Sequence, residues 1–95
     1  MQTEAQTRKL EGFSFNDRTQ GFCMTFANGW NVSVVWGGGT YSSNRDAEYG
    51  KAPRNSRTAE TLVWKGDDIS NGTEDGWLTA DKVAALLAEV AARGE

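Results

Sequence analysis

Two alternating runs of side chains constrain the fold of this chain more than any other feature. Residues 21–26 and 30–36 each place large apolar side chains at every second position. Successive side chains of a β-strand point to opposite faces, so each run predicts a strand with one apolar face. The sequence between them reads Ala27-Asn28-Gly29, and Asn and Gly tolerate the backbone of tight turns. These residues therefore predict an antiparallel hairpin.

Two shorter runs predict further strands. Phe13 and Phe15 flank a serine and predict a short first strand, followed by turn residues. Strand character returns at residues 60–65, where we expect Leu62 and Trp64 on the inner face and Val63 on the outer face. Residues 66–76 are rich in Gly and acids and predict a turn region.

A helix is expected at the C-terminal end. Thr79 can cap it, Asp81 suits the positive first turn, and Glu89 and Arg93 can pair one turn apart. We expect Gly94 to end it. Its apolar side chains recur at helical spacing at Val83, Leu86, Leu87 and Val90.

Together these patterns predict an α+β fold: a small antiparallel meander of about four strands packed against one C-terminal α-helix. We expect residues 1–11 to form a flexible N-terminal segment and residues 12–95 a single domain. Three tryptophans fall on the predicted inner face, namely Trp30, Trp36 and Trp64. The opposite face is then solvated or buried against a second copy in a homo-oligomer, and it carries Ser14, Cys23, Thr25, Asn31, Ser33, Val35 and Val63.

Composition excludes several classes of function. The 95 residues include no His and one Cys, so side chains cannot form a disulfide, a familiar zinc site or a histidine-based triad. We therefore expect no enzyme activity, no metal and no cofactor. A net charge of −3 disfavours nucleic acid as a partner. No apolar run is long enough to cross a membrane and the first residues are polar, so we expect a cytoplasmic protein with no membrane partner.

The candidate binding surface is a long polar segment at residues 37–57, within a predicted loop at 37–58. Its glycines can point backbone N–H groups into an anion-binding concavity, although they can equally relieve crowding where a strand ends. Aromatic rings beside them can stack on a base, and cations can close over phosphates. The candidate ligand-binding residues are Trp36, Gly37, Gly38, Gly39, Thr40, Tyr41, Ser43, Asn44, Arg45, Lys51, Arg54 and Arg57.

Charge is distributed unevenly along the chain. Residues 45–57 carry four cations and two carboxylates, whereas residues 60–81 carry six carboxylates and one cation. Such a split can orient a ligand or a protein partner, or reflect two solvated loops. The acidic stretch at residues 67–75, or a face of the sheet, is the candidate contact for a protein partner.

Several pieces resemble a group of short uncharacterised proteins encoded by tailed bacteriophages. The matching pieces, spread over residues 21–91, are Asn28-Gly29-Trp30, Val32-Ser33-Val34, Trp36-Gly37 with Gly39 and Tyr41, Ala59-Glu60 with Val63-Trp64, and Gly76-Trp77-Leu78-Thr79. In that group a Cys often follows the loop Tyr, whereas Ser42 stands here. The resemblance implies no activity, only the context of a small phage accessory protein that binds a host component.

Two functions remain open. One is a phage accessory protein that captures an anionic small ligand, such as a nucleotide signal of host immunity, without catalysis. The alternative is an inhibitor or adaptor that binds and blocks a host enzyme or defence protein.

Overall fold

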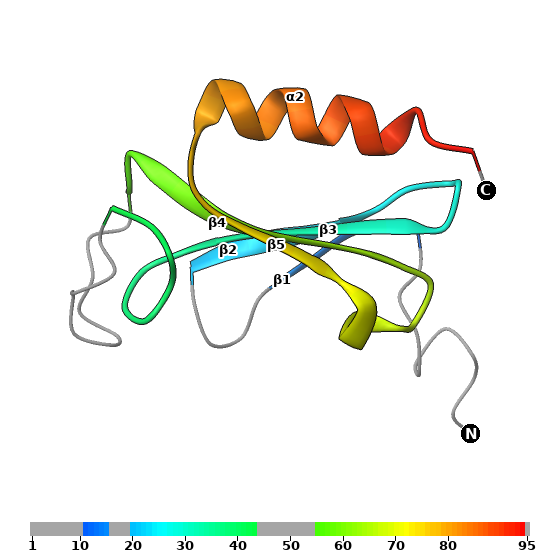
Figure 1. Cartoon of the computed structure of the whole chain (residues 1–95), viewed down its shortest axis with the longest axis horizontal. Coiled ribbons are helices and arrows are strands. Elements are labelled where there is room, and N and C mark those ends of the chain that lie inside the picture. Colours follow the sequence, from blue (N-terminus) through cyan, green and yellow to red (C-terminus); the bar gives the residue numbers. More distant parts are fainter. Residues whose placement is uncertain (1–10, 16–19, 44–54, 95) are drawn as a thin grey trace.

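The computed structural model describes residues 11–15, 20–43 and 55–94. In these residues the chain forms one five-stranded antiparallel sheet in the order β1-β2-β3-β4-β5, with a single α-helix on one face (Figure 1). This arrangement confirms the predicted α+β fold. The elements are β1 Gly12–Phe15, β2 Gln20–Thr25, β3 Trp30–Trp36, β4 Thr58–Lys65, the 3-10 turn η1 Ile69–Asn71, β5 Thr73–Thr79 and α2 Ala80–Ala91.

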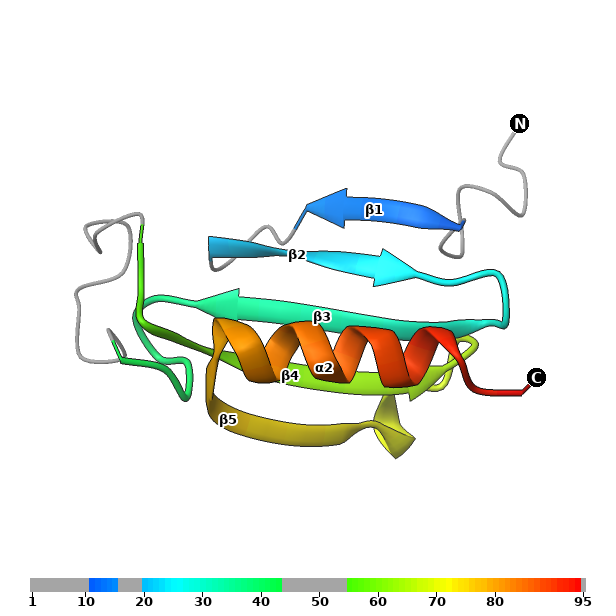
Figure 2. The ribbon, with the colours of Figure 1, turned by 90° about the horizontal axis from the view of Figure 1, so that it is seen from above.

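The helix covers only part of the sheet. It packs against β3, β4 and β5, and Figure 2 shows it running along the strands above β3 and β4, with β1 and β2 to one side. Thr79 caps its first turn as predicted, with its hydroxyl accepting from the N–H of Lys82 at 3.4 Å.

The predicted hairpin joins β2 to β3. The N–H of Gly29 donates to the carbonyl of Phe26 at 2.9 Å, and the N–H of Phe26 donates to the carbonyl of Trp30 at 2.9 Å. Gly29 has a φ of 88°, which favours glycine at this position. The turn therefore needs a positive φ at the glycine and not at Asn28.

The helix ends earlier than expected, so the prediction that Gly94 ends it was wrong. Its last residue is Ala91. The side-chain amide of Asn28 donates to the carbonyls of Val90 at 2.9 Å and Arg93 at 3.0 Å. The hairpin turn thus satisfies carbonyls that a helix C-terminus leaves without a partner.

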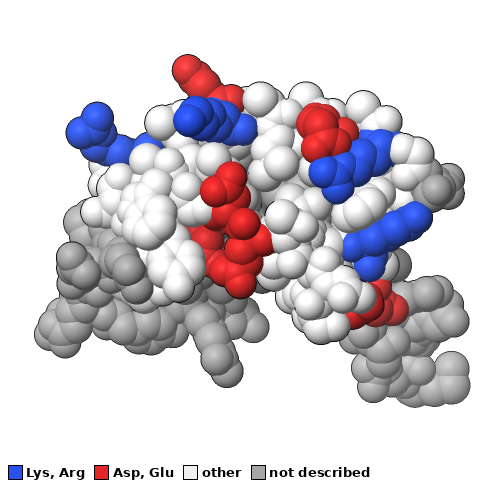
Figure 3. Space-filling model, in the orientation of Figure 1, with Lys and Arg blue, Asp and Glu red and all other residues white. Residues whose placement is uncertain are grey.

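A fifth strand begins within the predicted acidic turn region at residues 66–76, which corrects that prediction for residues 73–76. β5 pairs with β4 and forms one edge of the sheet. Acidic side chains are unfavourable inside a sheet but keep an exposed edge from pairing with other chains. Figure 3 shows acidic side chains gathered in the middle of the face along which this edge lies. Glu74 and Asp75 of β5 are both exposed.

The predicted faces of β4 were also reversed. Val63 pairs with Val32 of β3 and packs in the core beneath the helix, whereas Trp64 pairs with Asn31 on the opposite face. Leu62, Val63 and Trp64 are all apolar, so alternation by itself does not assign the inner face. The pairing register with β3 decides it.

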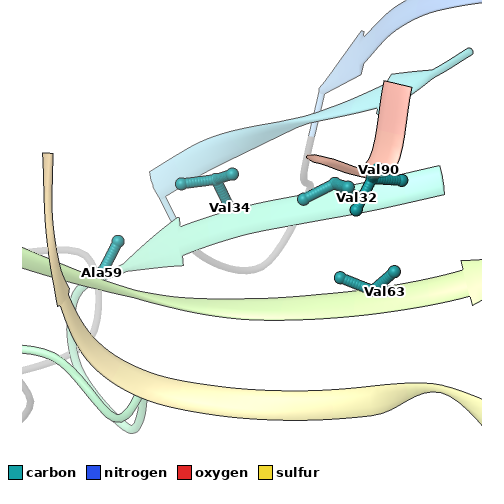
Figure 4. Packing of buried hydrophobic residues seen from close by; sticks show 5 residues of the cluster. All are labelled: Val32, Val34, Ala59, Val63 and Val90. Carbon is teal, nitrogen blue, oxygen red and sulfur yellow. The ribbon is translucent and has the colours of Figure 1, made fainter. Parts of the chain in front are cut away.

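The core lies between the helix and the middle of the sheet, and Figure 4 shows five of its side chains converging from β3, β4 and α2. Val32 and Val90 are fully buried. Trp30 and Trp36 pack against this cluster, as predicted, whereas Trp64 does not belong to it. The cluster consists of Val32, Val34, Ala59, Val63 and Val90.

Candidate functional site

The glycine-rich turn after β3 is closed by its own threonine. Gly37 and Gly39 have φ values of 113° and 83°. The N–H of Thr40 donates to the carbonyl of Gly37 at 3.2 Å, and its hydroxyl donates to the same oxygen at 2.8 Å. Thr40 is buried, so these interactions stabilise the turn.

The residues after this turn bind to β4 and β5. The N–H of Tyr41 donates to the Glu60 carboxylate at 2.9 Å, and the N–H of Trp77 donates to the carbonyl of Tyr41 at 2.8 Å. A side chain at Gly76 would approach the Cβ of Tyr41 to 2.7 Å. The segment thus lies against the sheet, and three of its backbone N–H groups, those of Thr40, Tyr41 and Ser43, donate to oxygens of the chain.

Two aromatic rings meet where this segment joins β5. The centroids of Tyr41 and Trp77 lie 5.4 Å apart, and the residues are 42% and 54% exposed. Trp77 has a φ of 52°, which is unusual for a bulky residue. The sequence does not predict that Tyr41 and Trp77 meet, because Trp77 reaches the loop only in the folded chain.

A largely apolar groove of about 450 Å³ lies between the N-terminal half of α2 and the adjoining ends of β2, β3 and β4. At this place the helix and the sheet do not pack directly against each other. The apolar side chains of Phe22, Val34, Trp36, Val83 and Leu87 are among those lining it. Asn55, Ser56, Arg57, Thr58, Ala59, Leu78, Ala80 and Ala84 complete the lining.

The electrostatic character of the groove comes from one side chain. Arg57 is exposed and is the only charged residue in the lining described above. The N-terminal end of α2 reaches the same groove through Ala80, and a helix N-terminus carries a partial positive charge. Asp81 in the first turn carries a full negative charge that opposes this partial charge, but it does not line the groove. Arg57 is therefore the group that favours an anion at this end of the groove.

The structure divides the predicted site residues into three sets. Trp36 and Arg57 line the groove. Residues Gly37, Gly38, Gly39, Thr40, Tyr41 and Ser43 belong to the turn and the segment that follows it. Asn44, Arg45, Lys51 and Arg54 lie outside the described residues.

Most of the groove lining is not among the residues named as candidates from the sequence. Asn55 and Ser56 fall within the predicted binding segment at residues 37–57, and Thr58 directly follows it, but none of the three carries a pattern that singles it out. A weak signal was present in the helix, where Ala80 and Ala84 stand one turn apart beside the predicted core positions. Small side chains at that spacing leave room between a helix and a sheet.

A second, smaller depression of about 300 Å³ lies on the other side of the helix, over β4 and β5. Its lining is more mixed and includes Asp75, Lys82 and Arg93. Among the residues that the structure describes, no group of three or more His, Cys, Asp or Glu side chains could hold a metal ion.

Comparison with known proteins found no matching family, curated protein or solved structure. In the described part of the chain, no helix has the length and apolar character needed to span a membrane.

Proposed function

We propose that this chain is a non-catalytic binding domain that captures a small anionic ligand with a flat apolar body, such as a nucleotide, in the groove between α2 and the sheet. The observation that carries the proposal is the pairing of Trp36 and Arg57 in one groove of about 450 Å³. That volume lies within the ordinary range of small-molecule sites.

The lining suits the two halves of such a ligand. Trp36, Phe22 and Val34 offer aromatic and apolar surface for a base. Arg57 can bind a phosphate through charge-assisted hydrogen bonds, and Asn55 and Ser56 beside it can donate or accept. No carboxylate, cysteine or lysine belongs to the lining described above, which supports binding without a general base.

The resemblance to phage accessory proteins supplies a context for this activity. A small protein that binds a host nucleotide signal tightly lowers its free concentration and so blunts the response that the signal triggers. In that role the protein needs affinity and abundance and does not need turnover.

Isothermal titration calorimetry with a panel of linear and cyclic nucleotides tests the proposal. Arg57→Ala should weaken binding by about 10- to 150-fold, because a hydrogen bond to a charged group contributes roughly 1.5 to 3 kcal/mol. Lys82→Ala is the matched control, since Lys82 is an exposed cation on the far side of the helix. Arg45→Ala and Arg54→Ala test two of the three further cations that the sequence predicts for this ligand.

Absence of binding to every nucleotide in the panel would refute the proposal, as would an Arg57→Ala variant that binds as tightly as the Lys82→Ala control. Amide chemical shifts give a second readout. With ligand added, the largest changes should fall on groove residues such as Ala59 and Ala84, and not on the far depression near Thr73.

A second candidate function is the inhibition of a host protein, and the exposed ring pair of Tyr41 and Trp77 favours it. Exposed aromatic residues are enriched at protein interfaces, and this pair adjoins the carboxylate of Glu60. If this function holds, Tyr41→Ala should abolish binding to the host protein. Ile69→Ala is the control, because Ile69 is also a large exposed apolar residue. A complex that survives Tyr41→Ala argues against this surface.

A further inference from the structure

The smaller depression beside α2 combines charged, polar and apolar side chains. It measures about 300 Å³ and lies over β4 and β5, and this volume is at the lower end of the range for small-molecule sites. Lys82, Leu86 and Arg93 line it from the helix side, because residues at these spacings fall on one flank of a helix. Since Lys82 and Arg93 stand about three helical turns apart, the depression is an elongated trough along the helix.

The middle of the trough contains a buried hydroxyl. Thr61 of β4 is 1% exposed and lines the depression. Among the residues that the structure describes, the Thr61 hydroxyl has no hydrogen-bond partner. A buried hydroxyl is ordinarily hydrogen-bonded, so this one can accept a bond from a polar group placed in the trough.

A carboxylate lies beside this hydroxyl. Asp75 pairs directly with Thr61 across β4 and β5, so the two side chains share the face of the sheet on which the helix lies. Asp75 lines the same depression, and its Oδ1 accepts the N–H of Gly76 at 2.9 Å. A carboxylate and a hydroxyl side by side can both accept hydrogen bonds from one ammonium group.

Two cations also line the trough. The Glu89 carboxylate holds Arg93 in place through bonds of 2.6 Å from Nε and 2.7 Å from Nη2, and the Trp30 ring lies under its guanidinium. These two bonds use two of the five N–H groups of an arginine, and the others suit a carboxylate. Lys82 is exposed and forms no ion pair in the part of the chain that the structure describes, although Asp75 lines the same depression.

The topology sets the order of these charges. β5 leads directly into α2, which runs back along the strands (Figure 2). Arg93 therefore lies toward the start of β5, and Lys82 lies toward its end near Leu78. Asp75 falls between the two cations, and Leu86 adds apolar surface from the helix. The charges along the trough thus run positive, negative, positive.

We infer that this trough binds a free amino acid with an acidic side chain, such as glutamate. Such a molecule carries two carboxylates and one ammonium, which complements a lining with two cations and one carboxylate. Arg93 binds the α-carboxylate through its planar guanidinium, and Asp75 and Thr61 accept hydrogen bonds from the ammonium. Lys82 binds the side-chain carboxylate, and the methylene groups lie against Leu86. This site is separate from the groove proposed for a nucleotide.

Calorimetric titration with L-glutamate, L-glutamine and glutarate tests the inference. Glutamine lacks the second carboxylate and glutarate lacks the ammonium, so each should bind about tenfold more weakly than glutamate, or weaker still. Asp75→Asn should weaken glutamate binding by about 10- to 150-fold, the range for a lost hydrogen bond to a charged group. Glu74→Gln is the matched control, because Glu74 is the preceding residue of the same strand and points to the opposite face.

Two further variants assign the remaining contacts. Lys82→Gln should bind glutamate and glutamine equally well, because it removes the cation that distinguishes them. Thr61→Val should weaken glutamate binding yet melt no lower than the parent, because its hydroxyl has no partner in the described fold. Circular dichroism melts of all variants establish that each one is folded.

The inference is overturned if the parent binds none of the three compounds, or if Asp75→Asn binds glutamate as tightly as Glu74→Gln does. It is also overturned if Arg57→Ala abolishes glutamate binding, because Arg57 lines the groove and not the trough. Nucleotide binding should be the same in Asp75→Asn and in the parent. The two proposals can therefore fail independently.

Discussion

At the scale of single residues, Asn28 links the hairpin to the end of the helix. Its amide nitrogen donates to carbonyls of Val90 and Arg93, and its Oδ1 accepts from the N–H of Trp30 at 3.1 Å. One side chain thus organises a turn and also caps a helix more than sixty residues later. Few residue types can do both, because the task needs a donor and an acceptor on a short side chain.

Asn28→Asp separates these two roles. The carboxylate keeps the acceptor for Trp30 but loses the donors and places a negative charge at the negative end of the helix. We expect a loss of about 2 to 3 kcal/mol in the free energy of unfolding, measured by urea denaturation. Asn55→Asp is the control, since Asn55 is exposed. Equal stability of Asn28→Asp and the parent would show that the cap contributes nothing.

Gly21 marks a close approach between β2 and β3. It has a φ of 144°, and a Cβ there would overlap the carbonyl oxygen of Val34 and reach the Cα of Val35 at 2.8 Å. Both obstacles are backbone, so a side chain forces the strands apart. Gly21→Ala should lower the free energy of unfolding by about 3 kcal/mol or more. Gly94→Ala, at an open position, should change it little, and a mild effect at both sites would contradict the close approach.

At the scale of elements, the predicted ion pair joins the last turn of α2 to the residues that follow the helix. Arg93 binds the Glu89 carboxylate with Nε 2.6 Å from Oε2, and its guanidinium lies 4.5 Å from the centroid of the Trp30 ring. The hydrogen bond from Arg93 lowers the pKa of Glu89 below its ordinary 4.5. The pair therefore connects the charged flank of the helix to the edge of the core.

The lowered pKa of Glu89 predicts a pH dependence. The unfolded chain takes up this proton more readily than the folded chain, so the pair stabilises the fold above pH 4.5 and ceases to do so as the pH falls through the lower folded value. The stability difference between the parent and Glu89→Gln should shrink as denaturation is repeated at falling pH through this window. A difference that is constant with pH would show that the pair does not contribute.

At the scale of the whole molecule, stability should be graded across the sheet. β3 and β4 are paired on both sides and lie under the helix, whereas β1 is a four-residue edge strand without helix contact in the described structure. Native-state hydrogen exchange should be slowest at backbone amides near Val32 and Val63 and fastest in β1. Uniform exchange across all five strands would contradict this gradient.

Much of the fold follows from the sequence by itself. The alternation in β2 and β3, the Gly29 turn and the helical spacing from Val83 to Val90 are local patterns, and each predicts its element because side-chain periodicity follows directly from backbone geometry. The α+β class follows from their combination. Of the site residues that the sequence predicts, Trp36 and Arg57 line one groove.

Only the tertiary structure decided the remaining features, because each depends on contacts between distant residues. The register with β3 turns Val63 inward and Trp64 outward, although both are apolar. Pairing with β4 makes a strand of an acidic segment whose local preference is for a turn. The long-range bonds of Asn28 set the end of the helix. The groove exists because one helix cannot cover five strands, and the width of a sheet is a property of the assembled strands that no single segment encodes.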